Sequence, residues 1–138
     1  MPQNEKELLL KDLCARVPYG VKYMRYSWDY DTDQELPVIE TLECADKDGY
    51  INHRRVYTVD DIKPYLFPLS SMTEEQIQEY TYIVNYISSD DTENWKEGEF
   101  IYVEQFTQLM HFYHINHLDY MGLIPMGLAI DATGLNIY

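Results

Sequence analysis

The segment of residues 63–76 constrains the fold more than any other part of the chain, because the sequence before it is strand-like and the sequence after it is helix-like. It reads Lys63-Pro-Tyr-Leu-Phe-Pro-Leu-Ser-Ser-Met-Thr-Glu-Glu-Gln76. Pro64 and Pro68 remove two backbone donors and bias the preceding residues towards extended geometry, which argues against a regular helix or a central strand. The segment is nonetheless too apolar for a solvated linker. We therefore expect an ordered strap that packs against a core.

The same segment ends in a clear helix-start signal. Thr73 and Gln76 have the spacing of a capping box, and Met72 and Ile77 have that of a hydrophobic staple. Apolar residues then recur at helical spacing and predict a helix that stops before a polar loop over residues 88–98; they are Ile77, Tyr80, Ile83, Val84 and Ile87. A last helix is predicted over residues 102–115, with Asn116 as a left-handed stop. Its apolar stripe consists of Val103, Phe106, Met110 and Tyr113.

The first half of the chain predicts one helix and three strands. Residues 4–17 have a helical pattern with Asn4 as the N-cap and an apolar stripe of Leu9, Leu10, Leu13, Cys14 and Val17. Val21–Trp28, Leu36–Ala45 and Tyr50–Val59 are rich in strand-forming residues, and the turns between them are short, which favours an antiparallel meander. The prediction is a single α+β domain, residues 1–138. It has an N-terminal helix, a small antiparallel β-meander that can curl towards a barrel, and two C-terminal helices.

Charge and composition restrict the function. The 138 residues include 24 acidic and 10 basic side chains, which gives a formal net charge of −14. Such a surface repels phosphate backbones and anionic lipids, so we expect neither direct nucleic-acid binding nor membrane binding. Cys14 and Cys44 lack the spacing of a metal or redox site, and no leader or membrane-spanning pattern is present. These features favour a cytoplasmic protein in which both cysteines are buried as small hydrophobic side chains.

Tyrosine is unusually abundant, with 14 residues against 4 phenylalanines. A tyrosine side chain has an apolar body and a polar tip, so it suits positions that are half buried. The excess favours a thin core, and it also fits a contact surface. Tyrosine-rich patches are compatible with a homodimer.

One acidic stretch matches part of a calcium-loop template. Asp29, Asp31, Asp33 and Glu40 stand at the spacing of four ligand positions of such a loop. Gln34 stands where the sharp turn requires glycine, and the flanking sequence is strand-like rather than helical. An acidic hairpin turn is therefore the preferred interpretation, and calcium is the cofactor that the sequence leaves open.

Three histidines raise the question of a metal or catalytic site. His111 and His114 can share one face of a helix, whereas His117 falls on another face and beyond the predicted helix end. The sequence contains no paired cysteines, H-E-x-x-H motif, glycine-rich phosphate loop or nucleophile elbow. We therefore expect histidines at the rim of an apolar helix, and no catalytic or cofactor-binding residue can be named.

Several motifs carry a resemblance to a known family. They are the segment 63–76, Leu13-Cys-Ala-Arg-Val-Pro-Tyr-Gly-Val-Lys22, Asn116-His-Leu-Asp-Tyr120, Gly122-Leu-Ile and Gly127-Leu-Ala-Ile-Asp131. Together they span most of the chain, which resembles small uncharacterised proteins encoded in gut Bacteroidales and in their phages and mobile elements. The resemblance implies a common scaffold with variable hairpins around residues 28–50 and 88–98. It implies no activity, cofactor or catalytic residue.

Three functions follow as hypotheses. The first is a non-enzymatic protein-interaction or regulatory module of phage or mobile-element origin, whose tyrosine-rich surface binds an unidentified protein partner. The second is an acidic mimic of DNA that inhibits a nucleic-acid-binding protein, which requires the carboxylates of residues 29–48 and 73–104 to meet on one face. The third is a hydrolytic enzyme that uses Asp or Glu with His111 or His114, which requires a cleft that holds those groups.

Overall fold

Strand β5 (Ile62–Pro68) is the centre of the fold. In this computed structural model, which describes residues 1–52, 54–85 and 98–138, β5 pairs antiparallel with β1 (Lys22–Asp29) and parallel with the short strands β6 (Leu118–Asp119) and β7 (Ile130–Asp131). The remaining neighbour of β1 is β2 (Gln34–Thr41). The strand order is β2-β1-β5-β6, with β7 also on β5. The predicted α+β class is confirmed, and the sheet does not close into a barrel.

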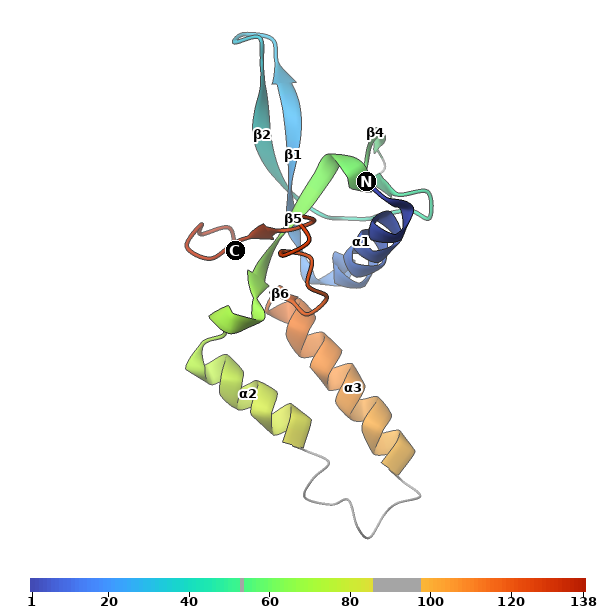
Figure 1. The fold of residues 1–138 in the computed structure, drawn as a ribbon, viewed down its shortest axis with the longest axis vertical. Helices are drawn as coiled ribbons and strands as arrows, with labels where there is room; N and C mark the ends of the chain where they lie inside the picture. The colour runs from blue at the N-terminus through green and yellow to red at the C-terminus, as the bar shows by residue number, and fades with distance from the viewer. Residues whose placement is uncertain (53, 86–97) are drawn as a thin grey trace.

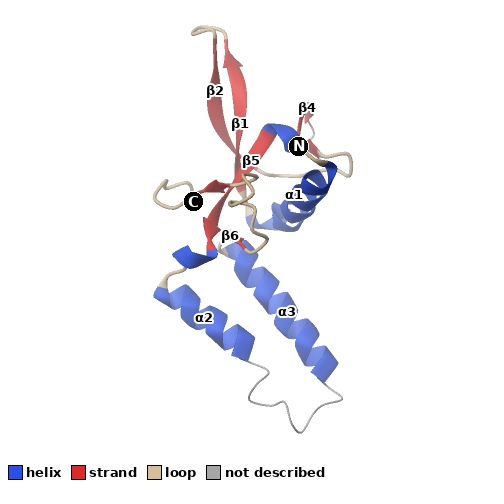
Figure 2. Ribbon diagram, in the orientation of Figure 1, coloured by secondary structure: helices blue, strands red, loops and turns tan. Residues whose placement is uncertain are grey.

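Figures 1 and 2 show the arrangement of the elements. The β1–β2 ribbon projects from one end of the molecule, and the helices α2 (Glu74–Asn85) and α3 (Gly98–Ile115) extend from the other. Helix α1 (Gln3–Arg16) lies beside the middle of the sheet, and the C-terminal segment crosses the same region. None of the helices in the described part of the chain combines the length and the hydropathy that a membrane crossing requires.

The two prolines of β5 do not interrupt the sheet, so the expectation that no central strand can pass through them is wrong. The Leu42 N–H donates to the Val21 carbonyl at 2.8 Å. Hydrogen-bonded pairs alternate along an antiparallel ladder, so the odd-numbered residues of β1 bond to β2 and the even-numbered residues bond to β5. Pro64 lies opposite Tyr23, an odd-numbered residue, and its ring nitrogen therefore points away from β1. No ladder donor is lost there, and Pro68 is the last residue of the strand.

The stretch predicted as a third strand is divided in two. β3 (Tyr50–Ile51) and β4 (Arg54–Thr58) pair with each other as a separate two-stranded sheet. The predicted turn before them is present, with Gly49 at φ +86°. The 3-10 helix η2 (Val59–Asp61) follows these two strands. The position beside β1 is thus taken by β5, because residues 50–59 fold back on themselves.

Helix α1 buries a stripe that includes two charged residues. Leu9 and Leu13 enter the main core. Asp12 and Arg16, one helical turn apart, are also buried, with no exposed surface on either side chain. The predicted cap is wrong, because the helix begins at Gln3 after an N-cap at Pro2. The prediction of two buried cysteines is also wrong: Cys14 is exposed and Cys44 is half buried. Asp12 and Arg16, rather than Cys14, complete the buried face of the helix.

The buried pair joins the two hydrophobic cores. Arg16 Nε donates to Asp12 Oδ2 at 2.7 Å, and Arg16 Nη2 donates to the Leu118 carbonyl at 2.7 Å. The guanidinium carbon lies 5.2 Å from the centre of the Tyr120 ring. Burial raises the pKa of Asp12, and the adjacent Arg16 opposes this shift. Since Leu118 belongs to the second core, the pair connects α1 to the helical end of the molecule.

The helical end confirms the predicted helix start. The Thr73 N–H donates to Gln76 Oε1 at 2.9 Å and the Gln76 N–H donates to Thr73 Oγ1 at 3.2 Å, which is the predicted capping box. The second core consists of Ile83, Phe112, Tyr113 and Leu118. Among the described residues, the predicted apolar stripes are only partly buried: Ile83 and Tyr113 lie in the second core, and Ile87 lies outside the described residues. Ile77 and Phe106 are exposed.

Two further details of the helical end differ from the prediction. Helix α3 begins at Gly98, earlier than expected, and the left-handed residue after it is His117 at φ +54° rather than Asn116. The Asn116 side chain instead donates to the Phe112 carbonyl at 2.9 Å. The predicted polar loop over residues 88–98 lies outside the described residues, except that Gly98 is helical.

The C-terminal segment covers the main core. Leu123, Leu128 and Ala129 pack into that core. The Tyr138 hydroxyl accepts from the Lys22 N–H at 2.9 Å and donates to the Tyr65 carbonyl at 2.6 Å, so it bridges β1 and β5 where their ladder ends. Burial raises the pKa of Tyr138 to about 12.

Candidate partner-binding surface

The β1–β2 ribbon extends beyond the rest of the sheet. β1 pairs with β2 along its full length, from Lys22 opposite Thr41 to Asp29 opposite Gln34. Its pairing with β5 covers only residues 23–25. Residues 26–37, which we call the ribbon extension, therefore form a two-stranded structure that stands clear of the helices (Figure 1).

One face of the ribbon is apolar and exposed. Directly opposite residues of an antiparallel pair point to the same face, and the faces alternate along each strand. The face that we call the aromatic face therefore carries Met24, Tyr26, Trp28, Pro37 and Ile39, together with Glu35 opposite Trp28. Tyr26 is 52% exposed, Trp28 48% and Ile39 49%. An exposed row of large apolar side chains is typical of a contact surface.

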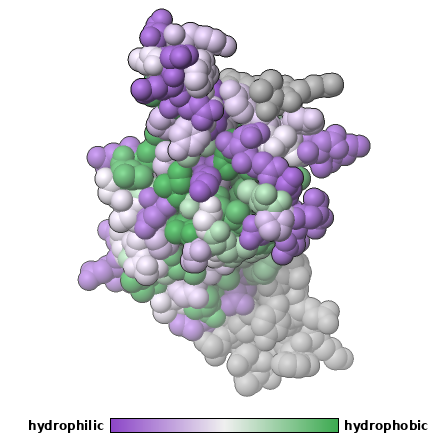
Figure 3. Space-filling view, turned by 45° about the horizontal axis from the view of Figure 1, so that its top comes forward, coloured by the Kyte–Doolittle hydropathy of each residue, from purple (hydrophilic) through white to green (hydrophobic). Residues whose placement is uncertain are grey.

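The end of the ribbon has a different character. Asp29, Asp31 and Asp33 lie in or beside its turn, and no ion pair to any of them is formed by the described residues. The space-filling view shows hydrophilic residues at the end of the ribbon and hydrophobic residues gathered in the middle of the molecule (Figure 3). The ribbon thus combines an apolar face with an acidic end.

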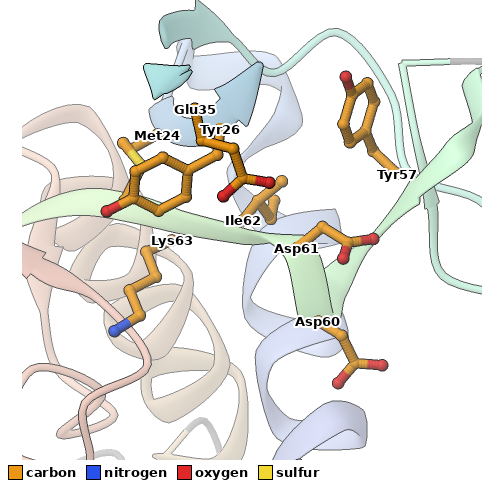
Figure 4. Close-up of a pocket in the computed structure, with 8 residues that line it drawn as sticks. All are labelled: Met24, Tyr26, Glu35, Tyr57, Asp60, Asp61, Ile62 and Lys63. Carbon is orange, nitrogen blue, oxygen red and sulfur yellow. The ribbon is translucent and has the colours of Figure 1, made fainter. Parts of the chain in front are cut away.

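A pocket of about 390 Å³ opens where β5 leaves β1 (Figure 4). Figure 4 shows Tyr26 and Glu35 on one side of this pocket and Tyr57 on the other. Its lining contains three carboxylates and one ammonium group, so the pocket is acidic. The complete lining is Met24, Tyr26, Glu35, Tyr57, Asp60, Asp61, Ile62 and Lys63.

The three carboxylates of the pocket are in different states. Asp60 pairs with Lys6, whose Nζ lies 2.7 Å from Asp60 Oδ2. Asp61 accepts the Thr58 N–H at 2.9 Å in the capping box of η2, with no cation beside it among the described residues. Glu35 forms no hydrogen bond or ion pair with any described residue. Two of the three carboxylates are therefore available to a cation.

A polar network fixes the base of the ribbon beside this pocket. Arg25 Nη2 donates to Glu40 Oε1 at 2.7 Å, and Arg25 Nη1 donates to the Tyr57 hydroxyl at 3.2 Å. The Tyr23 hydroxyl donates to Glu40 Oε2 at 2.6 Å. The hydrogen bond that Arg25 donates to the Glu40 carboxylate raises the pKa of Arg25. This network holds β1, β2 and β4 in a fixed relation at the mouth of the pocket.

The residues of the calcium-loop template are not brought together. The Asp29 carboxylate accepts the Asp31 N–H at 3.0 Å and the Thr32 hydroxyl at 2.8 Å, which stabilises the hairpin turn. Glu40 lies six ladder positions away, opposite Tyr23, which places it about 20 Å along the strand. In the described part of the chain, no group of three or more His, Cys, Asp or Glu side chains is placed to hold a metal ion. Calcium binding stays a question for titration calorimetry.

The histidines lie in a second groove, of about 620 Å³, between α2 and α3. Its lining includes Glu79, His111 and His114 together with the apolar side chains of Ile83 and Phe106. The groove therefore gathers the residue types that a hydrolytic enzyme would use.

Both histidines of the groove already have hydroxyl partners. His111 Nδ1 lies 3.0 Å from the Tyr19 hydroxyl, and His114 Nε2 lies 2.8 Å from the Tyr120 hydroxyl. Burial lowers the pKa of His114 to about 4, and an imidazole with this pKa is a weak general base at neutral pH. His117 lies elsewhere, as predicted, and stacks on the Tyr138 ring with 3.7 Å between ring centres.

The two acidic regions of the sequence lie apart. The turn of the ribbon is at one end of the molecule, and α2, which carries Glu74, Glu75 and Glu79, is at the other (Figure 1). Part of the second region, residues 86–97, lies outside the described residues. The described carboxylates thus form no common row of the kind that a mimic of DNA requires.

No protein-family model, curated protein or solved structure matches this chain. The resemblance to proteins of gut Bacteroidales and their phages stays a prediction. The candidate surface is accordingly defined by its own geometry.

The sequence contained a signal for the aromatic face that the interpretation above did not use. Met24, Tyr26 and Trp28 alternate along the predicted first strand, and period-two alternation of apolar residues marks one face of a sheet. Their exposure could not be read from this pattern, because the same alternation is typical of a face that packs on a core. The pocket forms where β5 diverges from β1, and no local sequence pattern predicts the point at which the two strands separate.

Proposed function

We propose that this protein is a non-enzymatic interaction or regulatory module that binds a protein partner through the aromatic face of its ribbon. The observation that supports it most is the exposed row of Tyr26, Trp28 and Ile39 on a ribbon whose backbone is fixed by a ladder. Burying apolar surface contributes roughly 25 cal/mol per Å², and a backbone that is already fixed by a ladder loses little further conformational entropy on binding. A partner gains most of its binding free energy from such a row.

The acidic character of the ribbon end and of the pocket complements a basic partner. Charge complementarity accelerates association and makes it sensitive to salt, while the apolar contact resists dissociation. Following the resemblance given above, we propose that the partner is a cytoplasmic protein of a Bacteroidales host or of its mobile elements.

The proposal is tested by capture of partners from a lysate of such a host at low and high salt. The ribbon variant Tyr26→Ser with Trp28→Ser should lose the partner that the natural sequence captures. Leu36→Ser is the matched control, because Leu36 is also exposed but lies on the opposite face of the same ribbon. This control should retain the partner.

Two results would contradict the proposal. One is a partner that both variants capture equally well, which would move the contact away from the ribbon. The other is the absence of any specific partner at low salt. Circular dichroism of both variants shows whether the fold is kept.

A further inference from the structure

We infer that the open edge of β1, at residues 26–29, accepts an extended basic segment of the partner as an additional strand. This inference rests on the proposed function and names the chemistry of the partner. Strand addition to a sheet edge uses main-chain hydrogen bonds for affinity and side-chain contacts for specificity. The structure supplies both kinds of group at this edge.

The main-chain groups follow from the phase of the ladder. The bond from the Leu42 N–H to the Val21 carbonyl assigns the odd-numbered residues of β1 to β2. The N–H and C=O groups of Tyr26 and Trp28 therefore point to the other side, where β5 pairs no further than Arg25. These groups form a short ladder with no strand opposite it among the described residues.

The other edge of the ribbon is blocked. By the same phase, Pro37 lies in a pair without ladder hydrogen bonds, opposite Tyr26, so its ring nitrogen faces outward from β2. A proline in this position interrupts the row of outward donors and protects an edge strand from pairing. One edge of the ribbon is therefore closed to an additional strand, and the edge at Tyr26 and Trp28 is left open.

The surroundings of the open edge select a basic segment. The acidic pocket adjoins this edge, and its Glu35 and Asp61 carboxylates have no cation beside them among the described residues. The Lys63 ammonium group also lines this pocket, and its positive charge opposes the binding of a basic segment. The side chains of an added strand would alternate between Tyr26 on the aromatic face and the Arg25–Tyr57 side, where Tyr57 offers an aromatic ring. A segment that alternates lysine with β-branched residues fits this edge best.

A second copy of the chain fits less well. The net charge of −14 makes two copies repel each other, and the strands of the ribbon carry more carboxylates than ammonium groups. A basic partner gains from the charges that a second copy would have to overcome.

The test uses fluorescent hexapeptides of alternating lysine and valine, and the full protein. Fluorescence anisotropy should show that the lysine peptide binds and that a glutamate–valine peptide does not. Two further lysine peptides carry N-methyl groups on alternate residues, in one register or in the other. Only one register faces β1, so one of these peptides should lose binding while the other keeps it.

A pair of protein variants tests the hydrogen bond that the Trp28 N–H would donate to the added strand. Trp28→Ala and Trp28→Pro both remove the indole, but only the proline also removes the N–H that faces the open edge. Trp28→Pro should fold, because Pro37 already occupies an equivalent position on β2. It should bind the lysine peptide about fivefold or more weakly than Trp28→Ala does, as expected for the loss of a hydrogen bond and the intrusion of the ring.

The outcomes separate this inference from the proposed function. Equal binding of all the lysine peptides and of both Trp28 variants overturns strand addition and leaves the aromatic face as a contact surface. If the lysine peptide does not bind but capture of a partner still depends on Tyr26, the claim that the added segment is basic is overturned and the proposed function stands. Self-association in sedimentation that Trp28→Pro abolishes assigns the edge to a second copy and overturns the inference as well.

Discussion

Tyr23 and Tyr26 lie three residues apart on the same strand and have opposite environments. Tyr23 is 1% exposed and its hydroxyl is held by Glu40 and Asn52, whereas Tyr26 is 52% exposed. The strand has not changed between them, and both residues pair with β2. Two things change: Tyr23 points to the face that packs into the main core, whereas Tyr26 points to the aromatic face, and β5 ends its pairing with β1 at Arg25.

The comparison divides the ribbon into two parts: a base, where β1 also pairs with β5, and the ribbon extension, where it does not. In the base, β1 lies between two strands, and Tyr23 shares the main core with the leucines of α1. In the ribbon extension, β1 has β2 alone, and both faces meet solvent. Stability should therefore depend on the base and binding on the extension, and each of the following measurements tests that division.

The largest effect is expected at the buried ion pair of the base. Arg16→Ala leaves the Asp12 carboxylate buried without its partner, and such a loss destabilises a protein by about 3–5 kcal/mol. Urea denaturation measures the change. Replacing both residues by apolar ones, Asp12→Leu with Arg16→Met, should restore most of the loss, because no buried charge is then left. If Arg16→Ala lowered the free energy of unfolding by less than about 1 kcal/mol, the Asp12 carboxylate would have to be accessible to water.

A matched pair of leucines tests the division directly. Leu66→Ala removes a side chain with no exposed surface from the central strand and should lower the free energy of unfolding by about 2–5 kcal/mol. Leu36→Ala makes the same change in the ribbon extension, where the side chain is 41% exposed, and should change it by no more than about 0.5 kcal/mol. Equal losses in the two variants would remove the distinction between base and extension.

The pH dependence of stability should also arise next to the base. Burial lowers the pKa of His114 to about 4 in the folded protein, against 6.5 for the unfolded chain. The unfolded state therefore binds more protons between these values, so this group contributes a stability that is full above pH 6.5 and is lost as the pH falls towards 4. The slope reaches about 1.4 kcal/mol per pH unit for one proton.

The variant His114→Gln measures this contribution. Its unfolding free energy should fall less steeply than that of the natural sequence between pH 6.5 and 4, whatever its stability at neutral pH. Denaturation series at several pH values give the two slopes. Parallel slopes would place the titrating group elsewhere.

The smallest effect is expected for the two tyrosines. Tyr23→Phe removes a buried hydroxyl that donates to the Glu40 carboxylate, which should cost about 1–2 kcal/mol. Tyr26→Phe removes an exposed hydroxyl and should leave the free energy of unfolding within about 0.5 kcal/mol. If Tyr26→Phe proved as costly, the extension would be held by contacts beyond its ladder.

Much of the local structure could be predicted from the sequence. The capping box at Thr73, the turn at Gly49 and the class of the fold depend on residues close together in the chain. The errors concern partners that are distant. Pro64 argued against a central strand, yet the ladder phase turns its missing donor away from β1.

The candidate surface could be predicted only in part. The alternation of Met24, Tyr26 and Trp28 puts them on one face, but only the position of β5 decides that this face is left in solvent. The calcium-loop spacing shows the converse, because Asp29 and Glu40 are close in the chain and far apart along an extended strand.

The start of α2, the turn at Gly49, the acidic charge and the α+β class follow from the sequence, because each depends on contacts within a few residues or on composition. Only the tertiary structure decided that β5 is central, that Arg16 is buried on the carbonyl of a residue 102 positions away, and that one edge of β1 stays open. These features depend on which segments meet in space, and burial changes the free energy of a charge or a backbone donor far more than local propensity does.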